Sequence, residues 1–189
     1  MSETFKKEEK KEETRAEEAK RRFIHLLDEE QVEIKRLDAN DIDDSVKVMQ
    51  KCAFEVTAAE VKTIVDYEKS FGATVNRMLV GVGLSWPSKL NMKDKTITVG
   101  EPNALYLEDP AVLLTYEGRG VRRMLIKERE DEAIRSGYKY IMAYLYEDVP
   151  KGDIGDYIRE AGSQLEKVYL SENYEFYRTT KGILAVKKL

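Results

Sequence analysis

Residues 104–123 read ALYLEDPAVLLTYEGRGVRR, and this stretch decides the fold because it combines a strand, a turn and the start of a helix. The mostly apolar residues 104–112 predict a strand, but Pro110 has no N–H to donate to a sheet, so we expect a bulge or a splayed position there. Gly118 and Gly120 let the backbone approach a ligand at the start of the helix, where unpaired N–H groups attract anions. The stretch therefore predicts an anion-binding loop at 117–122.

Two arginines follow the glycines and bear on the same prediction. Arg122 and Arg123 lie in the first helical turn, where a cation opposes the helix dipole at a cost of roughly 0.3–1 kcal/mol. A bound anion would compensate this cost; alternatively, Glu117 supplies the negative charge, or the arginines simply reach solvent. The loop has neither the G-x-x-x-x-G-K-[ST] pattern of a nucleotide P-loop nor a complete G-x-G-x-x-G dinucleotide motif. The sequence leaves the three explanations open.

The residues on both sides of the loop predict alternating strands and helices. Apolar spacing, caps and glycines indicate strands at 32–37, 78–86, 95–99, 104–112, 138–146, 174–178 and 183–187, and helices after Asp41, after Thr57, at 121–136 and along 154–168. Gly137 is a suitable residue to end the helix at 121–136. The order strand, turn, helix, strand around the loop indicates an α/β domain.

The first 31 residues differ in composition from the rest. They are dominated by Lys and Glu, and their apolar residues gather at 23–27. Such a segment cannot bury a core of its own, so we expect a charged helical or disordered arm, or a helix that binds a partner. His25, the only histidine, is not expected to be catalytic. We therefore predict an arm at 1–31 and one domain at 32–189.

Composition limits the classes of partner. The formal net charge of −4 argues against bulk binding of nucleic acid and suits a cationic substrate better than an acidic one. Cys52 is the only cysteine, so an intrachain disulfide is excluded, and we expect a small buried thiol without a catalytic role. No signal-peptide core or membrane-spanning run is recognisable, which predicts a cytoplasmic protein without a membrane partner.

Taken together, these motifs resemble the GNAT superfamily of N-acetyltransferases. Val112 ends the strand, residues 117–122 occupy the place of the family's Gln/Arg-x-x-Gly-x-Gly/Ala signature, and Gly137 closes the helix. Residues 168–174 (VYLSENY) fit a second frame, in which a tyrosine precedes Gly-Phe; here Asn and Tyr replace that pair. The signature departs from the family at Glu117, where Gln or Arg is usual, and at Arg122, where Gly or Ala is usual.

The resemblance implies an α/β (α+β) fold with a mixed, largely antiparallel central sheet, a splayed strand pair and flanking helices. It also implies acetyl-CoA as cosubstrate. The groups expected to hold acetyl-CoA are backbone donors of the strand and the loop that follows it: Asp109, Ala111, Val112, Glu117, Gly118, Arg119, Gly120, Val121, Arg122 and Arg123.

The same resemblance assigns candidate catalytic groups. Tyr169 is the candidate general acid for the leaving thiolate, with a core tyrosine as the alternative. Glu108 is the first candidate base and Glu101 the second, although either could be an ordinary surface glutamate. Tyr106 is expected to line the acceptor site. No metal site is expected.

The function that these features predict is transfer of acetyl from acetyl-CoA to a primary amine by direct attack. A protein N-terminus, a lysine, a polyamine or a small amine all remain candidates for the acceptor, and a homodimer remains open. The alternative is a non-catalytic CoA-binding or regulatory module with the same fold, which the altered residues Glu117 and Arg122 would permit.

Overall fold

The computed structural model describes residues 17–18, 31–145 and 149–189. The chain divides into two units, Met1–Val32 and Glu33–Leu189, and the second carries the features considered below. The predicted arm at 1–31, including His25, lies outside the described residues apart from 17–18 and 31, so both interpretations of it remain predictions. No helix in the described part of the chain is long and apolar enough to cross a membrane.

The second unit alternates strands with helices along most of its length. Its elements are β1 (Glu33–Arg36), the 3-10 helix η1 (Ala39–Asp41), α2 (Ile42–Lys51), α3 (Ala58–Val65), β2 (Phe71–Val75), β3 (Met78–Gly83), β4 (Ser85–Asn91), β5 (Thr96–Thr98), β6 (Ala104–Leu107), β7 (Ala111–Val112), the 3-10 helix η2 (Leu114–Tyr116), α4 (Val121–Arg135), β8 (Tyr140–Leu145), α5 (Ile154–Ala161), α6 (Gln164–Ser171), β9 (Glu175–Thr179) and β10 (Gly182–Lys188).

The strands form two sheets. One has the order β1-β2-β3-β7 and the other β5-β4-β6-β8-β10-β9. Every neighbouring pair is antiparallel except β6 and β8, which run parallel and are joined through the crossover helix α4. The predicted mixed, largely antiparallel fold with flanking helices is confirmed.

A bulge lies where the two sheets meet. Val82 and Ser85 are three residues apart in sequence. The residues that they pair with, Ala111 and Leu107, are four residues apart. The second strand therefore carries one extra residue in the segment 108–110, which includes Pro110. This confirms the irregularity that the proline predicts within residues 104–112.

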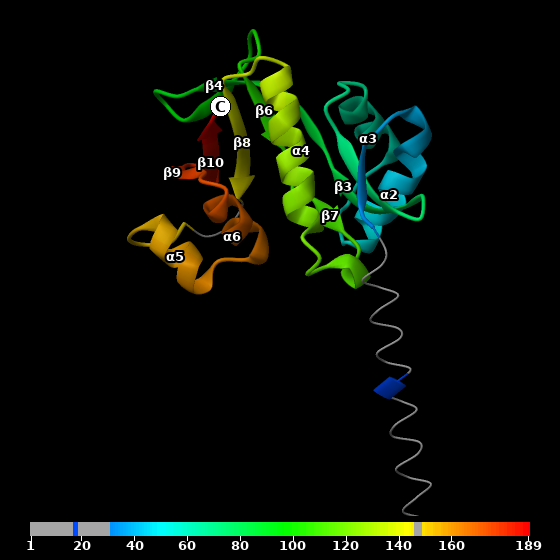
Figure 1. Cartoon of the computed structure of the whole chain (residues 1–189). Helices are drawn as coiled ribbons and strands as arrows, with labels where there is room; N and C mark the ends of the chain where they lie inside the picture. Colours follow the sequence, from blue (N-terminus) through cyan, green and yellow to red (C-terminus); the bar gives the residue numbers. More distant parts are fainter. Residues whose placement is uncertain (1–16, 19–30, 146–148) are drawn as a thin grey trace, which may run out of the picture. The chain divides into compact units, whose positions relative to one another are not determined.

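Helix α4 crosses the sheets close to β3 (Figure 1). A Cβ atom built on Gly81 would lie 3.1 Å from Val121 Cγ1, and one on Gly83 would lie 3.0 Å from the guanidinium carbon of Arg129. The neighbouring residues Val82 and Leu84 belong instead to the core cluster shared with α2 and α3. Successive side chains of a strand point to opposite faces, so large apolar side chains lie on one face of this segment. The glycines lie on the other face and leave room for α4 to pack against it.

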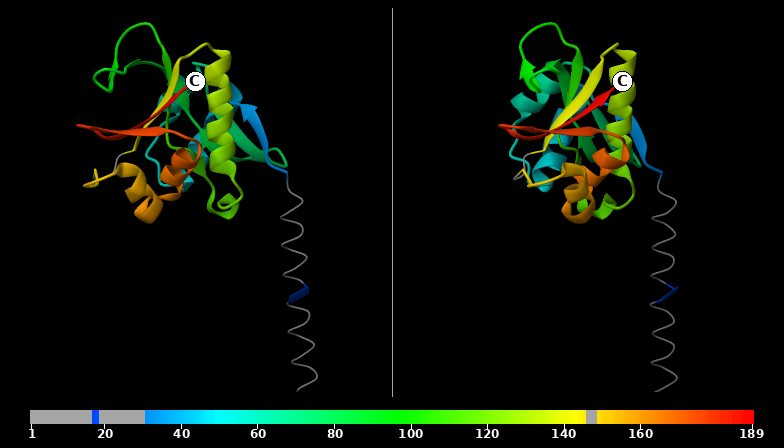
Figure 2. Two further views of the ribbon diagram at one scale, coloured as in Figure 1. Left: turned by 60° about the vertical axis from the view of Figure 1, so that its left-hand side comes forward. Right: turned by 90° about the vertical axis from the view of Figure 1, so that its left-hand side faces the viewer.

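Three sequence predictions about elements were wrong. Residues 71–75 form β2, where no strand was predicted, and the strand predicted at 78–86 is replaced by β3 and by β4, which continues through Pro87 to Asn91. The helix predicted along 154–168 is two helices, because α5 ends at Gly162 and Ser163 begins α6 with its own capping box. This break places α6 beside the N-terminal end of α4 (Figure 2).

Candidate functional site

The glycine loop forms an open turn at the start of α4. Gly118 and Gly120 have φ values of 77° and 76°, in the left-handed region that glycine adopts without strain, and a Cβ at either position would meet nothing within 4 Å. A pocket of about 540 Å³ opens here. It is lined by Glu117, Gly118, Gly120, Val121, Arg122 and Arg123 and, from α6, by Gln164 and Val168. The first N–H groups of α4 have no carbonyl partner within the helix, so the pocket suits an anion.

Arg122 and Arg123, in the first turn of α4, both form ion pairs with carboxylates of the chain. The Arg122 guanidinium donates to both carboxylate oxygens of Glu117, at 2.5–3.2 Å, and through Nη1 to the Pro110 carbonyl at 2.8 Å. Arg123 donates to Ser171 Oγ at 2.9 Å and lies 3.5 Å from a Glu172 carboxylate oxygen. Of the explanations that the sequence leaves open, compensation of Arg122 by Glu117 is the one this geometry displays. The arginines by themselves therefore do not require a bound anion.

Arg119, between the two glycines, stacks its guanidinium over the Tyr116 ring, 4.9 Å from the centroid. This cation–π contact holds the side chain against η2, while the pocket is lined by the residues on both sides of it.

The strands part next to this loop. Pairing between β6 and β8 runs from Ala104–Tyr140 to Tyr106–Met142 and then stops, and beyond the bulge β3 is the only neighbour of β7 among the described strands. Leu113 N donates to Val80 O, so by antiparallel alternation the N–H and C=O of Val112 point away from β3. In the described part of the chain, the Asp109 N–H has no backbone partner. Among the described residues, the N–H groups of Asp109 and Val112 are thus left without a backbone partner and can bind an extended ligand.

Two carboxyl groups accompany the bulge. Burial, together with the neighbouring Asp109, raises the pKa of Glu108, and burial likewise raises the pKa of Asp109. A raised pKa moves a carboxylate closer to what a general base needs near neutral pH. Glu101, in contrast, is exposed and precedes the opposite end of β6, so the structure does not bring it to the bulge.

Tyr169 lies on α6, fully buried, and its ring packs edge-on against that of Tyr174 at a centroid distance of 4.8 Å. Its hydroxyl has no hydrogen-bond partner among the described residues. Burial raises the pKa of Tyr169 well above its ordinary value, while the charge of Arg129 acts in the opposite direction. A buried hydroxyl without a partner is costly, and the neighbouring Tyr174 hydroxyl shares this feature, so both roles considered for Tyr169 stay predictions.

Arg129 is a buried charge near the bulge that sequence reasoning missed. It is fully buried; its Nε donates to Leu125 O at 3.0 Å, and its Nη1 donates to Leu84 O and Glu108 O, both at 2.9 Å. The available signal was the helical series Leu125, Arg129 and Ala133, in which an arginine interrupts an apolar stripe opposite Gly83.

Aromatic side chains gather on the other face of the second sheet. Tyr106 packs against Trp86, with ring centroids 4.6 Å apart, and lies 6.4 Å from the ring of Tyr144. Such faces attract cations.

Cys52, at the end of α2, donates through Sγ to Val112 O at 3.2 Å, and burial raises the pKa of its thiol. The cysteine is therefore half-buried beside β7, and its raised pKa agrees with the absence of a nucleophilic role.

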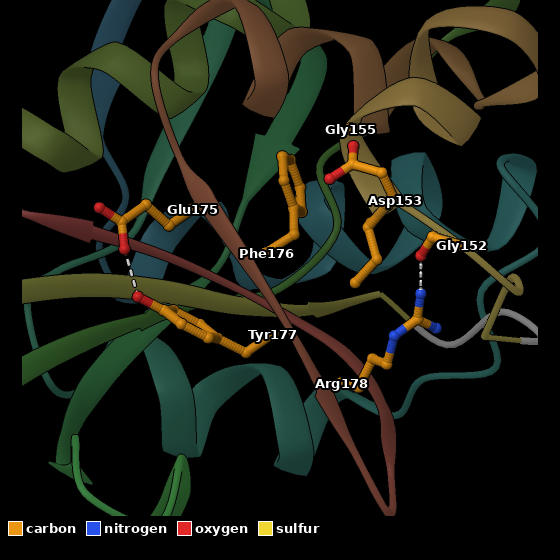
Figure 3. Close-up of a pocket in the computed structure, with 8 residues that line it drawn as sticks. Gly152, Asp153, Gly155, Glu175, Phe176, Tyr177 and Arg178 are labelled. Carbon is orange, nitrogen blue, oxygen red and sulfur yellow. Dashed lines mark hydrogen bonds between the residues drawn. The ribbon is translucent and has the colours of Figure 1, made fainter.

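A separate hollow lies between β9 and the start of α5 (Figure 3). Its polar groups are partnered: Arg178 donates to the carbonyls of Pro150 and Gly152, and Tyr177 donates to Glu175, which raises the pKa of Tyr177 to about 12. Nothing in this hollow calls for a ligand. The site is better sought at the parted strands.

Comparison with known proteins places the fold. No family model matches the sequence, and no curated protein matches it. Three solved structures show the extent of the likeness. The loading GNATL domain of CurA from Lyngbya majuscula is 14% identical, with 84% of this chain and 98% of that chain covered and a TM-score of 0.65. The GphF GNAT-like decarboxylase in complex with isobutyryl-CoA is 13% identical, with 82% and 98% covered and a TM-score of 0.64. The ribosomal-protein-S18-alanine N-acetyltransferase from Escherichia coli is 16% identical, with 84% and 94% covered and a TM-score of 0.58. The chain therefore has the fold of the GNAT superfamily of N-acetyltransferases.

Proposed function

We propose that the chain is an acyltransferase that moves an acetyl group from acetyl-CoA to a primary amine. The observation that carries the proposal is the parting of β6 and β8 at the bulge, directly beside the open glycine loop. An acyl-CoA offers a pyrophosphate for the helix start and an extended amide-bearing arm for the free backbone groups of Asp109 and Val112. The solved structure with isobutyryl-CoA shows that a protein of this fold binds an acyl-CoA.

The chain's own residues would divide the chemistry between them. The amine nitrogen forms a bond to the acetyl carbonyl carbon, the carbon–sulfur bond breaks, and its electron pair goes to sulfur. Glu108 or Asp109 takes the proton that the amine must lose, and Tyr169 donates a hydrogen bond or proton toward the sulfur. The Asp109 N–H would polarise the carbonyl oxygen.

Features around the bulge favour a cationic acceptor. The carboxyl groups of Glu108 and Asp109 and the aromatic cluster at Tyr106 both attract an ammonium group, and the formal net charge of −4 acts in the same direction. A protein N-terminus, a lysine, a polyamine and a small amine share this chemistry. One solved structure of the same fold is called a decarboxylase, so transfer is argued here from these residues and not from the fold.

The test begins with calorimetry of acetyl-CoA binding, using Gly120→Ala and Gly137→Ala as a matched pair. Both glycines have φ near 75° and open space around a Cβ, so both substitutions cost about 1–2 kcal/mol of stability. Only Gly120 lines the pocket, and only its substitution should weaken binding.

Incubation with acetyl-CoA and a panel of amines, read by mass spectrometry of acetylated products, then tests transfer. Absence of acetyl-CoA binding would refute the proposal. Binding without any product would favour the second candidate, a non-catalytic CoA-binding module, for which the Glu117–Arg122 pair in the loop is the motivating observation.

A further inference from the structure

Arg129 is a fully buried cation whose hydrogen-bond partners are all uncharged. Its three hydrogen bonds go to neutral backbone carbonyls, and its Nη2 has no partner among the described residues. No carboxylate in the described part of the chain forms an ion pair with it. Burying an unpaired charge is expensive, and a guanidinium does not escape the cost by losing its proton. The arrangement is expected to be completed by something negative.

The position of Arg129 limits what that negative group can be. Its carbonyl partners Leu84 and Glu108 lie at the bulge, where β6 and β8 part. Tyr169, whose hydroxyl also has no partner in the described residues, approaches from α6 and interacts electrostatically with the guanidinium. Glu108, Asp109, Tyr169 and Tyr174 are the titratable groups whose charges act on Arg129. Two buried donors without a partner, one on α4 and one on α6, thus lie near the carboxyl groups of the bulge.

A proton from Tyr169 would not suffice to stabilise a departing sulfur. A free thiol has a pKa of about 8.5, whereas burial raises the pKa of Tyr169 above the ordinary value for tyrosine of about 10. The phenol is therefore the weaker acid, and complete transfer of its proton to a thiolate is unfavourable. Stabilisation by a fixed positive charge has no such limit.

We infer that Arg129 supplies this charge: its free Nη2 stabilises the thiolate of CoA when the carbon–sulfur bond breaks, with Tyr169 hydrogen-bonding to the same sulfur. The inference rests on the proposed function, because it requires CoA at the parted strands. In this inference the buried arginine supplies a positive charge at the sulfur, which neither the glycine loop nor the backbone donors supply. Gly83, which leaves room for the guanidinium, becomes part of the same arrangement.

The test is the pH dependence of CoA binding, with an analogue that has hydrogen in place of the thiol as reference. If the protein stabilises the thiolate, the bound thiol has a lowered pKa, and CoA binds more tightly as pH rises from that value to about 8.5. The analogue corrects for every other titrating group. Since a nearby opposite charge lowers a pKa by about 1–3, the ratio of CoA affinity to analogue affinity should rise at least about fivefold between pH 6.5 and 9.

Variants assign the effect to Arg129. Arg129→Met should bind both ligands with a pH-independent ratio, whereas Arg129→Lys, which keeps the charge, should retain part of the rise. Arg135→Met removes an arginine from the exposed side of the same helix and should behave like the unchanged protein. Tyr169→Phe should also keep the rise, and this arm decides the question even if Arg129→Met does not fold.

The outcomes separate this inference from the proposed function. Absence of CoA binding at every pH would overturn both. Binding with a flat ratio in the unchanged protein would overturn the role of Arg129 alone, as would a rise that survives in Arg129→Met or disappears in Tyr169→Phe.

Discussion

Glu132 gives the sharpest stability prediction, because one buried carboxylate on α4 ties three parts of the chain together. Its Oε2 accepts from Arg36 at 2.7 Å, and its Oε1 accepts from Lys69 at 2.6 Å and from Ser136 at 3.0 Å. Burial by itself would raise the pKa of Glu132, but these hydrogen bonds outweigh it and lower the pKa from 4.5 to about 2. The carboxylate is therefore strongly favoured in the folded state.

The size of the effect follows from this difference. A pKa that falls from 4.5 to about 2 on folding corresponds to about 3 kcal/mol of stability at neutral pH. Because the folded value is the lower one, the contribution is fully present above pH 4.5 and is lost as the pH falls toward 2. Arg36 is 43% exposed, so solvent screening reduces its share, and we expect Glu132→Gln to cost about 2–3 kcal/mol at pH 7.

Urea unfolding of Glu132→Gln, with Glu128→Gln as control, measures this cost. Glu128 lies one turn away, is 32% exposed and pairs only with Arg135 among the described residues, so its substitution should cost less than about 1 kcal/mol. The deficit of Glu132→Gln should shrink to about half at pH 3. Equal costs for the two variants at pH 7, or a deficit that does not change with pH, would refute the reasoning.

Three further predictions concern the site. Glu117→Gln removes a negative charge from the loop at 117–122 and frees Arg122 from its ion pair. Calorimetry at low salt should therefore show an affinity for acetyl-CoA that is about threefold to tenfold higher. Unchanged or weaker binding would mean that the Arg122–Glu117 pair does not compete with the phosphates of acetyl-CoA. Cys52, the only cysteine, contacts Val112 O, so acetyl-CoA, which has no free thiol to consume the reagent, should slow its alkylation at pH 8, and an unchanged rate would place acetyl-CoA elsewhere. Gly83→Ala puts a Cβ 3.0 Å from the Arg129 guanidinium and should cost about 1–3 kcal/mol in urea unfolding, whereas a neutral result would show that Arg129 can move away freely.

Much of the fold could be predicted from local signals. Pro110 predicts the bulge because a missing N–H cannot be compensated inside a ladder, and Thr57 with Glu60 predicts the start of α3 because the capping box is complete within four residues. Gly137 predicts the end of α4, and its φ of 75° is the left-handed conformation expected there. In each case the physical cause lies within a few residues of its effect.

The features that the sequence did not predict all depend on tertiary contacts. Residues 71–75 are buried along their whole length as a central strand, so they lack the alternation that identifies a half-buried strand. Pro87 is accepted in β4, opposite Leu105, although proline ordinarily ends a strand in sequence-based reasoning. The Arg122–Glu117 pair joins residues five apart across a turn whose geometry the sequence does not specify. The glycine loop was predictable, but the destination of its charges was not.

The charges buried on α4 show why Arg129 belongs to the site and not to the scaffold. Glu130 accepts from Lys127 and Lys187, each at 2.6 Å, and Glu132 accepts from Arg36 and Lys69, so each buried glutamate joins α4 to a cation of the chain. Arg129, which directly precedes Glu130 in sequence, has carbonyls instead of carboxylates as partners. The described chain thus provides cations for the buried anions of α4 but no ion-paired carboxylate for its buried cation, as expected if Arg129 meets a ligand. The two carboxyl groups at the bulge differ from Glu132: burial raises the pKa of both Glu108 and Asp109 although the charge of Arg129 lowers it, whereas hydrogen bonds to cations lower the pKa of Glu132.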